Sequence, residues 1–262
     1  MFAYDFMRHA FAAAAIVALV SGSVGWFLVL RGQSFAGHAL SHVGFAGATG
    51  AVLAGIPPIW GLVAVTVAGG ALMGLLGERL AERDVAVGTV LTAALGLGML
   101  FISLFTTGAA QATSLLFGHV LGVDAATVWW MAAFGALTLG SLAVIARPLL
   151  LATLRPELAE AAGANLRLIS VLFLALVGLA VAEAVQVVGV LLVFALLVGP
   201  AATAQRLTAR VHAGIALSVA LAAAIALAGV ALAYFTDWPT SFWIATLSSA
   251  TYLLAVAATA AG

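Results

Sequence analysis

Long apolar stretches alternate with short polar breaks along the whole chain. Most stretches contain about 20 residues, which is enough for a helix to cross a hydrocarbon layer about 30 Å thick. The pattern therefore predicts an all-α fold, a polytopic membrane helical bundle with eight or nine spans. The predicted segments are 11–30, 36–56, 59–77, 86–106, 124–146, 168–185, 187–205, 212–234 and 241–259.

The break between the sixth and seventh segments decides between eight and nine spans. It consists only of the residues from Glu183 to Gln186. Glu183 is the only acidic residue between Leu168 and Gln205. An ionised carboxylate in hydrocarbon is costly. We therefore expect Glu183 at the outer rim or facing an aqueous path, and an interfacial turn residue is the alternative.

The arginines fix the predicted orientation of the bundle. Eight of the nine basic residues follow the first, third, fifth and seventh segments. Because positive residues accumulate in cytoplasmic connections, these four connections are expected in the cytoplasm, with the N-terminus outside and the C-terminus inside. The eight residues are Arg31, Arg79, Arg83, Arg147, Arg155, Arg167, Arg206 and Arg210.

Composition supports a membrane protein and excludes several functions. The chain is 65% hydrophobic and 7% charged, with a mean hydropathy of +1.26, whereas soluble domains are typically about 25% charged. Its 9 basic and 9 acidic residues leave no basic patch for nucleic acid. Because the basic residues are all arginine, the chain cannot hold a P-loop, so any ATP must be bound by a separate subunit. The absence of cysteine excludes thiolate metal sites.

The pattern indicates one transmembrane domain over 1–262, with one notable cytoplasmic segment. Residues 152–166 read as a short amphipathic helix. Pro156 suits its first turn, Glu157 lies near its N-terminus, and Gly163 suits its end. Such a helix could dock a cytoplasmic partner, and a plain connector is the alternative.

His38 and His42 are the leading candidates for chemistry. A spacing of four residues places both imidazoles on one helix face, one turn apart. Polar residues in a membrane helix usually face the protein interior or a water-filled path. A histidine pair at this spacing can hold a divalent transition metal. The small residues around the pair let helices approach closely, and they also leave room for a lumen.

Other polar residues are weaker candidates. His119 lies in the segment 114–123, which is too short to cross the membrane alone. If this segment is a re-entrant element, His119 is a candidate metal contact. Glu183 is a further candidate metal contact if it faces an aqueous path. Asp124 and Asp237 are expected to be helix-cap or turn residues on the outer side. The chain contains neither G-x-S-x-G nor H-E-x-x-H, so serine-hydrolase and intramembrane zinc-protease chemistry fit poorly.

Several motifs in order resemble the permease subunit of the bacterial ABC importers for zinc, manganese and iron. They are LVLRGQSFAGHALSHVGFAG at 28–47, ERDVAVGTV at 82–90, SLLFGHVLGV at 114–123, RPELAEAAG at 155–163 and VVGVLLVFALLVGPAATA at 187–204. The resemblance covers nearly the whole chain. It implies a bacterial inner-membrane location and a homodimer that pairs with two ATPase subunits. It also implies that a metal-loaded extracytoplasmic binding protein delivers the ion.

The resemblance also assigns roles to residues. The coupling helix that fits the ATPase would contain Arg155, Pro156, Glu157, Leu158, Ala159 and Gly163. The family's aspartate and histidine ion contacts map onto His38 and His42. The chain departs from the family where His38 replaces the usual aspartate, which softens the site and favours zinc over manganese. Arg155 also replaces an aspartate that the family often has.

The expected function is therefore ATP-driven import of a divalent metal, with Zn²⁺ as the favoured ion and no permanently bound cofactor. Two alternatives stay open. One is a permease for manganese, iron or a chelated metal of the siderophore type. The other is a secondary transporter driven by an ion gradient without an ATPase.

Overall fold

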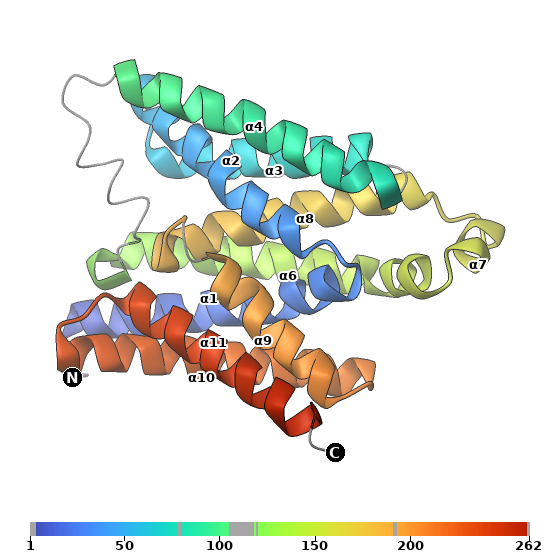
Figure 1. The fold of residues 1–262 in the computed structure, drawn as a ribbon. Helices are drawn as coiled ribbons and strands as arrows, with labels where there is room; N and C mark the ends of the chain where they lie inside the picture. The colour runs from blue at the N-terminus through green and yellow to red at the C-terminus, as the bar shows by residue number, and fades with distance from the viewer. Residues whose placement is uncertain (1–3, 78–79, 105–117, 119, 191–192, 261–262) are drawn as a thin grey trace. The chain divides into compact units, whose positions relative to one another are not determined.

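The computed structural model describes residues 4–77, 80–104, 118, 120–190 and 193–260 (Figure 1). In that part of the chain all regular structure is helical, which confirms the predicted class. The elements are α1 (Asp5–Leu30), α2 (Ser34–Leu53), α3 (Pro58–Leu76), α4 (Leu80–Leu104), the 3-10 turn η1 (Val120–Gly122), α6 (Ala125–Leu154), α7 (Pro156–Ala161), α8 (Leu166–Val188), α9 (Val193–Leu207), α10 (Val211–Thr236) and α11 (Thr240–Ala260).

Helices occupy all nine predicted segments within the described residues. Seven of these helices are long and apolar enough to cross a membrane: α1, α3, α4, α6, α8, α10 and α11. The other two are α9, which has only 15 residues, and α2, which has 20 residues but is rich in glycine, serine and histidine. The chain is a multi-pass membrane protein.

The prediction of a break at Glu183–Gln186 is wrong. α8 continues through both residues to Val188, and the helix stops at Gly189, whose φ is +78°. Glycine adopts this left-handed conformation without the penalty that a Cβ brings. Glu183 and Gln186 are polar residues inside a long helix, and the chain's stop signal is the glycine three residues after Gln186.

The local sequence also explains where α1 ends and where α3 begins. Gly32 has φ +66°, and its N–H and that of Gln33 bond back to the carbonyls of Val29 and Leu28, which closes the last turn of α1. Pro58 occupies the first position of α3, where its missing N–H has no partner to lose. Gly32 therefore marks the end of α1, and Pro58 marks the start of α3.

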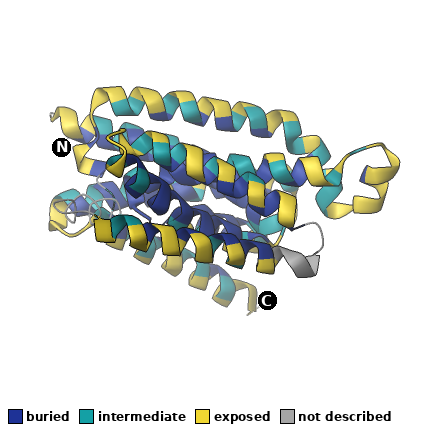
Figure 2. Cartoon of the chain, turned by 90° about the horizontal axis from the view of Figure 1, so that it is seen from above, coloured by how far each residue is buried: buried dark blue, intermediate teal, exposed yellow. Residues whose placement is uncertain are grey.

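The helices form two compact units, which are described separately. Unit 1 comprises Met1–Ser34, Ser114–Ala136 and Glu183–Gly262, and unit 2 comprises Phe35–Thr113 and Leu137–Ala182. Single helices carry exposed residues along one side and buried residues along the other (Figure 2).

In unit 1, α1 packs against α9 and α10, and α9 also packs against α10 and α11. Glycines on α1 allow the backbones of these helices to approach closely. A Cβ on Gly25 would collide with the carbonyl oxygen of Leu197 on α9, and one on Gly22 would come 2.7 Å from the Cα of Val219 on α10. Small residues are the usual means by which membrane helices gain close contact, because lipid supplies no hydrophobic force between them.

In unit 2, α3 lies between two partners. Gly61 of α3 meets Gly47 of α2 backbone to backbone. On another side of α3, Gly70 meets the carbonyl of Leu174, and Gly178 of α8 meets the carbonyl of Thr66. α3 therefore holds α2 in a fixed register, and α2 is the helix that carries the histidine pair.

Candidate functional site

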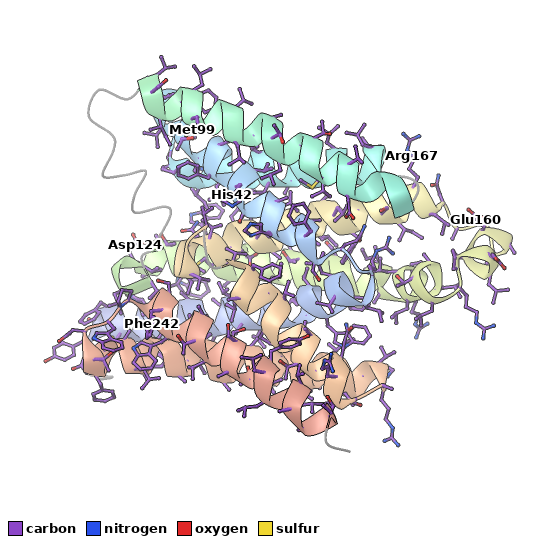
Figure 3. The ribbon with its side chains drawn as sticks, viewed as in Figure 1. His42, Met99, Asp124, Glu160, Arg167 and Phe242 are labelled. Carbon is purple, nitrogen blue, oxygen red and sulfur yellow. The ribbon has the colours of Figure 1, made fainter. Side chains whose placement is uncertain are left out.

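The histidine pair lies in the first half of α2. The rings of His38 and His42 have centroids 5.0 Å apart and planes at 83°, an edge-to-face arrangement. The spacing prediction is confirmed to this extent: the helix brings the two imidazoles together on one side. Figure 3 labels His42 on α2. Both side chains are half-buried, so neither is wholly sequestered from its surroundings.

Local contacts position the pair. Ser41 donates a hydrogen bond of 2.7 Å to the carbonyl oxygen of His38, inside the same helix. Phe35, one turn earlier, lies with its ring centroid 6.3 Å from that of His38. The serine hydroxyl is thereby satisfied within α2, and the phenylalanine ring covers one side of the first imidazole.

The packing of α2 shows which face the histidines occupy. Leu40, Val43 and Gly47 contact Gly69, Gly61 or Val65 of α3. At about 100° of rotation per residue, His38 and His42 fall on the opposite side of α2 from these contacts. The glycines of α2 therefore serve close packing on α3, as predicted from their size, and the imidazoles point away from α3.

A complete metal shell is not formed by acidic and imidazole side chains in the described part of the chain. No group of three or more histidine, aspartate or glutamate side chains gathers among those residues. Two imidazoles leave at least two positions of a tetrahedral ion for water or other donors. An open shell suits an ion that must leave again.

Glu183 belongs to unit 1, on the last part of α8. It is 2% exposed, which contradicts the expected place at an outer rim. Its Oε2 lies 3.6 Å from the position that a Cβ on Gly135 of α6 would occupy, and methyl groups of Ile16 and Val20 on α1 lie 3.2 Å from the same position. The carboxyl group is thus enclosed between helices rather than placed at an interfacial turn.

Gly135 is a residue that sequence reasoning missed. A larger side chain there would press on Ile16 and Val20 and approach the Glu183 carboxyl group. Glycine within a long apolar segment has many explanations, so no motif singled it out.

His119 lies outside the described residues, and its role as a metal contact stays a prediction. Its neighbour Gly118 has φ +75°, and a Cβ there would come 2.5 Å from the backbone nitrogen of Gly189. A cavity of about 200 Å³ in unit 1 adjoins this contact and involves none of the predicted site residues. Its lining residues are Gly118, Val120, Leu121, Val187, Pro239, Thr240 and Ser241.

The predicted cytoplasmic segment contains the short helix α7. Pro156 opens the helix and Arg155 precedes it, and Ala159 is fully buried whereas Glu157, Leu158 and Glu160 are exposed. Gly163 has φ +82° and its N–H bonds to the carbonyl of Glu160, so it ends the turn as its position suggested. Figure 3 labels Glu160 on this helix.

Asp124 and Asp237 lie at helix ends as cap residues, as predicted. The Asp124 carboxylate accepts a 2.8 Å hydrogen bond from the backbone N–H of Thr127 at the start of α6. Side-chain and backbone hydrogen bonds from Thr127 lower the pKa of Asp124, and His9 adds a smaller attraction. Asp237 ends α10 in the left-handed conformation, with φ 57°.

Comparison with known proteins identifies the family of this chain. The sequence matches the ABC 3 transport family over residues 3–259. The chain belongs to that family. This membership confirms the resemblance to ABC permeases for metals that the ordered motifs indicated.

Relatives within the ABC 3 transport family match most of the chain. It is 30% identical over 256 residues to the manganese transport system membrane protein MntC of Halalkalibacterium halodurans, a match covering 97% of this chain and 88% of that protein. It is 32% identical over 255 residues to a "Probable iron transport system membrane protein" of Haemophilus influenzae, covering 97% and 94%.

Among solved structures, a chain of PsaBC from Streptococcus pneumoniae in complex with Fab has a TM-score of 0.85. The two chains are 26% identical, and the match covers 96% of this chain and 91% of that one.

Proposed function

We propose that this ABC 3 family chain is the permease subunit of an ATP-driven importer of a divalent metal, and that His38 and His42 form a transient ion site. The observation that carries the proposal is the pair of imidazole rings 5.0 Å apart on the face of α2 that turns away from α3. Neutral imidazole is a good ligand for zinc and accepts other first-row divalent ions.

Zinc is the first candidate ion because both donors are nitrogen. Harder ions such as Mn²⁺ prefer carboxylate and water oxygen. Manganese is the second candidate, and the name of the Halalkalibacterium relative favours it. Iron is favoured in the same way by the name of the Haemophilus relative. Glu183 and His119 are proposed as further contacts along the path.

The partners in this proposal follow from what the chain cannot do by itself. Without a lysine it has no P-loop, so a separate cytoplasmic subunit would bind and hydrolyse ATP. That subunit would dock on α7 and its flanks, through Arg155, Pro156, Glu157, Leu158, Ala159 and Gly163. A second copy of the chain and an extracytoplasmic metal-binding protein complete the importer, and all of 1–262 forms one transmembrane permease domain.

The ion site is tested by replacing both histidines with alanine and measuring metal uptake in cells. We expect uptake to fall to background at unchanged membrane expression, because two ligands are lost. His212→Ala, at the exposed start of α10, is the matched control and keeps uptake. Normal uptake by the double variant would refute the proposed site.

The choice of ion is tested with the purified, reconstituted importer. Uptake of radioactive Zn²⁺ is measured with Mn²⁺ or Fe²⁺ as competitor, and the reverse. Zinc specificity predicts that excess manganese competes weakly. The variant His38→Asp should shift the preference toward manganese, since a carboxylate replaces a softer donor. A wild-type preference for manganese would select the second candidate.

The docking role of α7 has its own experiment. Glu157→Arg reverses an exposed charge, and we expect weaker co-purification with the ATPase and loss of ATP-driven uptake. Asp5→Arg, an equal charge change at the start of α1, is the control. An intact, coupled complex with Glu157→Arg would overturn the docking role. Uptake by the chain alone in liposomes under an ion gradient would instead support a secondary transporter.

A further inference from the structure

Exposure changes sharply along the face of α2 that carries the histidines. Four residues lie within about 60° of His38 around the helix axis: Phe35, Phe45, Thr49 and Leu53. Phe35 is 46% exposed, and both imidazoles are half-buried. Phe45 is then only 9% exposed and Thr49 1%, whereas Leu53 is again 39% exposed. This face is therefore accessible from the start of α2 as far as the histidines, and it is closed just beyond them.

Helix α4 of the same unit lies against the closed stretch. A Cβ on Gly98 of α4 would lie 3.6 Å from Cδ1 of Phe45 and 3.7 Å from Cβ of Ala46. Farther along both helices, a Cβ on Gly50 would lie 2.9 Å from Cε2 of Phe101. Because later residues of α2 meet later residues of α4, the two helices run in the same direction here. The ring of Phe45 is therefore seated on a position of α4 that has no side chain.

The packed side of α4 is apolar. Val87, Val90, Ala94 and Gly98 recur every three or four residues, and all four are buried. Met99, the residue after Gly98, is 69% exposed and lies on the other side of the helix (Figure 3). Residues at this spacing share one helix face. The buried stripe therefore presents neither a charge nor a polar side chain.

The side chains of the closed stretch of α2 offer an ion no ligand either. The hydroxyl of Thr49 bonds back to the carbonyl oxygens of Phe45 at 2.9 Å and Ala46 at 3.1 Å, within its own helix. The methyl group of Thr49 and the ring of Phe45 are left to face their surroundings. An ion that moved from the imidazoles toward the end of α2 would lose its water ligands there without gaining others, which is costly.

We propose that Phe45, seated on Gly98, is a hydrophobic gate that closes the ion site toward the end of α2. The proposal rests on the proposed function, in which His38 and His42 bind the transported ion. Phe45 follows His42 by three residues, or about 4.5 Å along the helix axis. Narrow apolar constrictions stop ions because water leaves them. Since the arginines predict that α2 begins on the cytoplasmic side, the gate would lie on the outer side of the ion site.

The contacts of α2 also indicate how the gate opens. Against α3, a Cβ on Gly61 would collide with the backbone of Gly47, so these two helices interlock. At Gly98 of α4, the nearest atoms of α2 lie at 3.6–3.8 Å, an ordinary van der Waals contact. At Gly50 the neighbour is the side chain of a phenylalanine, which can change rotamer. A shift of α4 therefore unseats Phe45 while α2 keeps its register on α3.

The gate is tested with the importer reconstituted in liposomes loaded with radioactive Zn²⁺ or Mn²⁺, without ATP. The wild type should retain the ion. Phe45→Ala removes the ring and should cause loss of the trapped ion, because the other side of the site is already accessible. Phe45→Leu keeps an apolar side chain and should restore retention. Phe235→Ala, the same change at an exposed position of α10, is the matched control and should retain the ion. Full retention by Phe45→Ala would overturn the proposal.

Thiol labelling tests the gate without metal. The chain contains no cysteine, so an introduced cysteine is its only thiol. In the complete importer, a small cationic methanethiosulfonate reagent should modify Phe35→Cys rapidly and Thr49→Cys slowly, measured as a mass gain of this chain. Thr49→Cys combined with Phe45→Ala should become as reactive as Phe35→Cys.

The labelling outcomes keep the two proposals apart. Rapid labelling of Thr49→Cys with Phe45 in place would overturn the gate even if Phe45→Ala failed to fold. Because no metal takes part, normal uptake by the double histidine variant would refute the ion site and leave the labelling pattern unchanged. Slow labelling that Phe45→Ala does not accelerate would mean that other packing protects Thr49, which also contradicts the gate.

Discussion

The two units join their helices by different means. In unit 1, buried hydroxyl and amide side chains reach across to the backbone of a neighbouring helix: Ser218 bonds to the carbonyl of Gly22 at 2.7 Å, and Ser248 to that of Ala195 at 2.6 Å. In unit 2, α3 meets both neighbours through glycine contacts, such as Gly61 with Gly47 and Gly70 with Leu174.

The difference shows where polar groups are used. In lipid, helices associate through close packing and interhelical hydrogen bonds, because the surrounding tails are as apolar as the side chains. Unit 1 combines both devices and buries most of α1. Unit 2 holds α2 by its glycine face, so the opposite face can present His38 and His42. A helix fixed by its backbone can offer its polar side chains to a ligand.

The largest expected effects come from filling a glycine contact. Gly25→Ala in unit 1 and Gly70→Ala in unit 2 each force a Cβ onto a backbone carbonyl that cannot yield. Overpacking of this kind costs about 1–3 kcal/mol, so thermal unfolding in detergent should occur at a lower temperature for both. Gly140→Ala, where nothing lies within 4 Å, is the control and should match the wild type or exceed it. Similar behaviour of all three variants would show that the contacts do not hold the units.

Gly163→Ala separates backbone conformation from close packing. This glycine has φ +82° with nothing within 4 Å of its Cβ position, so only the left-handed backbone opposes the substitution. We expect a loss of about 1–2 kcal/mol, measured by local hydrogen exchange at α7. Unchanged protection at α7 would show that the turn adapts freely.

Removing a hydrogen bond should have a smaller effect. Ser218→Ala and Ser248→Ala should each lower the free energy of unfolding by about 0.6 kcal/mol, the mean for side-chain bonds between membrane helices. Ser103→Ala, whose hydroxyl bonds within its own helix at an exposed position, is the matched control. Equal losses in all three would mean that the interhelical bonds give unit 1 no particular stability.

The smallest effect is expected at Asp124. Because its pKa is lowered in the folded chain, its charged cap stabilises the fold above the unfolded pKa of about 4. That stabilisation is lost as the pH falls through the lowered pKa. Asp124→Asn should unfold at a slightly lower temperature than wild type at neutral pH, and this difference in unfolding temperature should disappear on acidification. A difference that grows toward acid pH would contradict the lowered pKa of Asp124.

Much of the fold was predictable because each span must satisfy its own backbone and be apolar. That requirement makes length and hydropathy sufficient to locate the seven long apolar helices, whereas α2 and α9 were located from the polar breaks on either side of them. The end of α8 was misplaced because Glu183 and Gln186 looked like a polar break. Only packing against α1 and α6 allows such a residue inside the bundle, and the backbone stop at Gly189 carries no polar signal.

The sequence predicted that the two histidines of the candidate site lie close together, but it did not predict which way they point. Helical periodicity alone puts His38 beside His42. Helical periodicity does not reveal that Val43 and Gly47 pack on α3, which places the two imidazoles on the face of α2 away from α3. The space beside Glu183 depends on Gly135, which is 48 positions away along the chain, and no local pattern links the two residues.

The sequence by itself determined the class of protein, its helices and the pairing of two imidazoles, because these depend on short-range geometry and on transfer between water and lipid. Tertiary structure alone decided which face of α2 the histidines occupy and that Glu183 is enclosed. These depend on contacts between helices distant in sequence, where the absence of a single Cβ sets how closely two backbones approach.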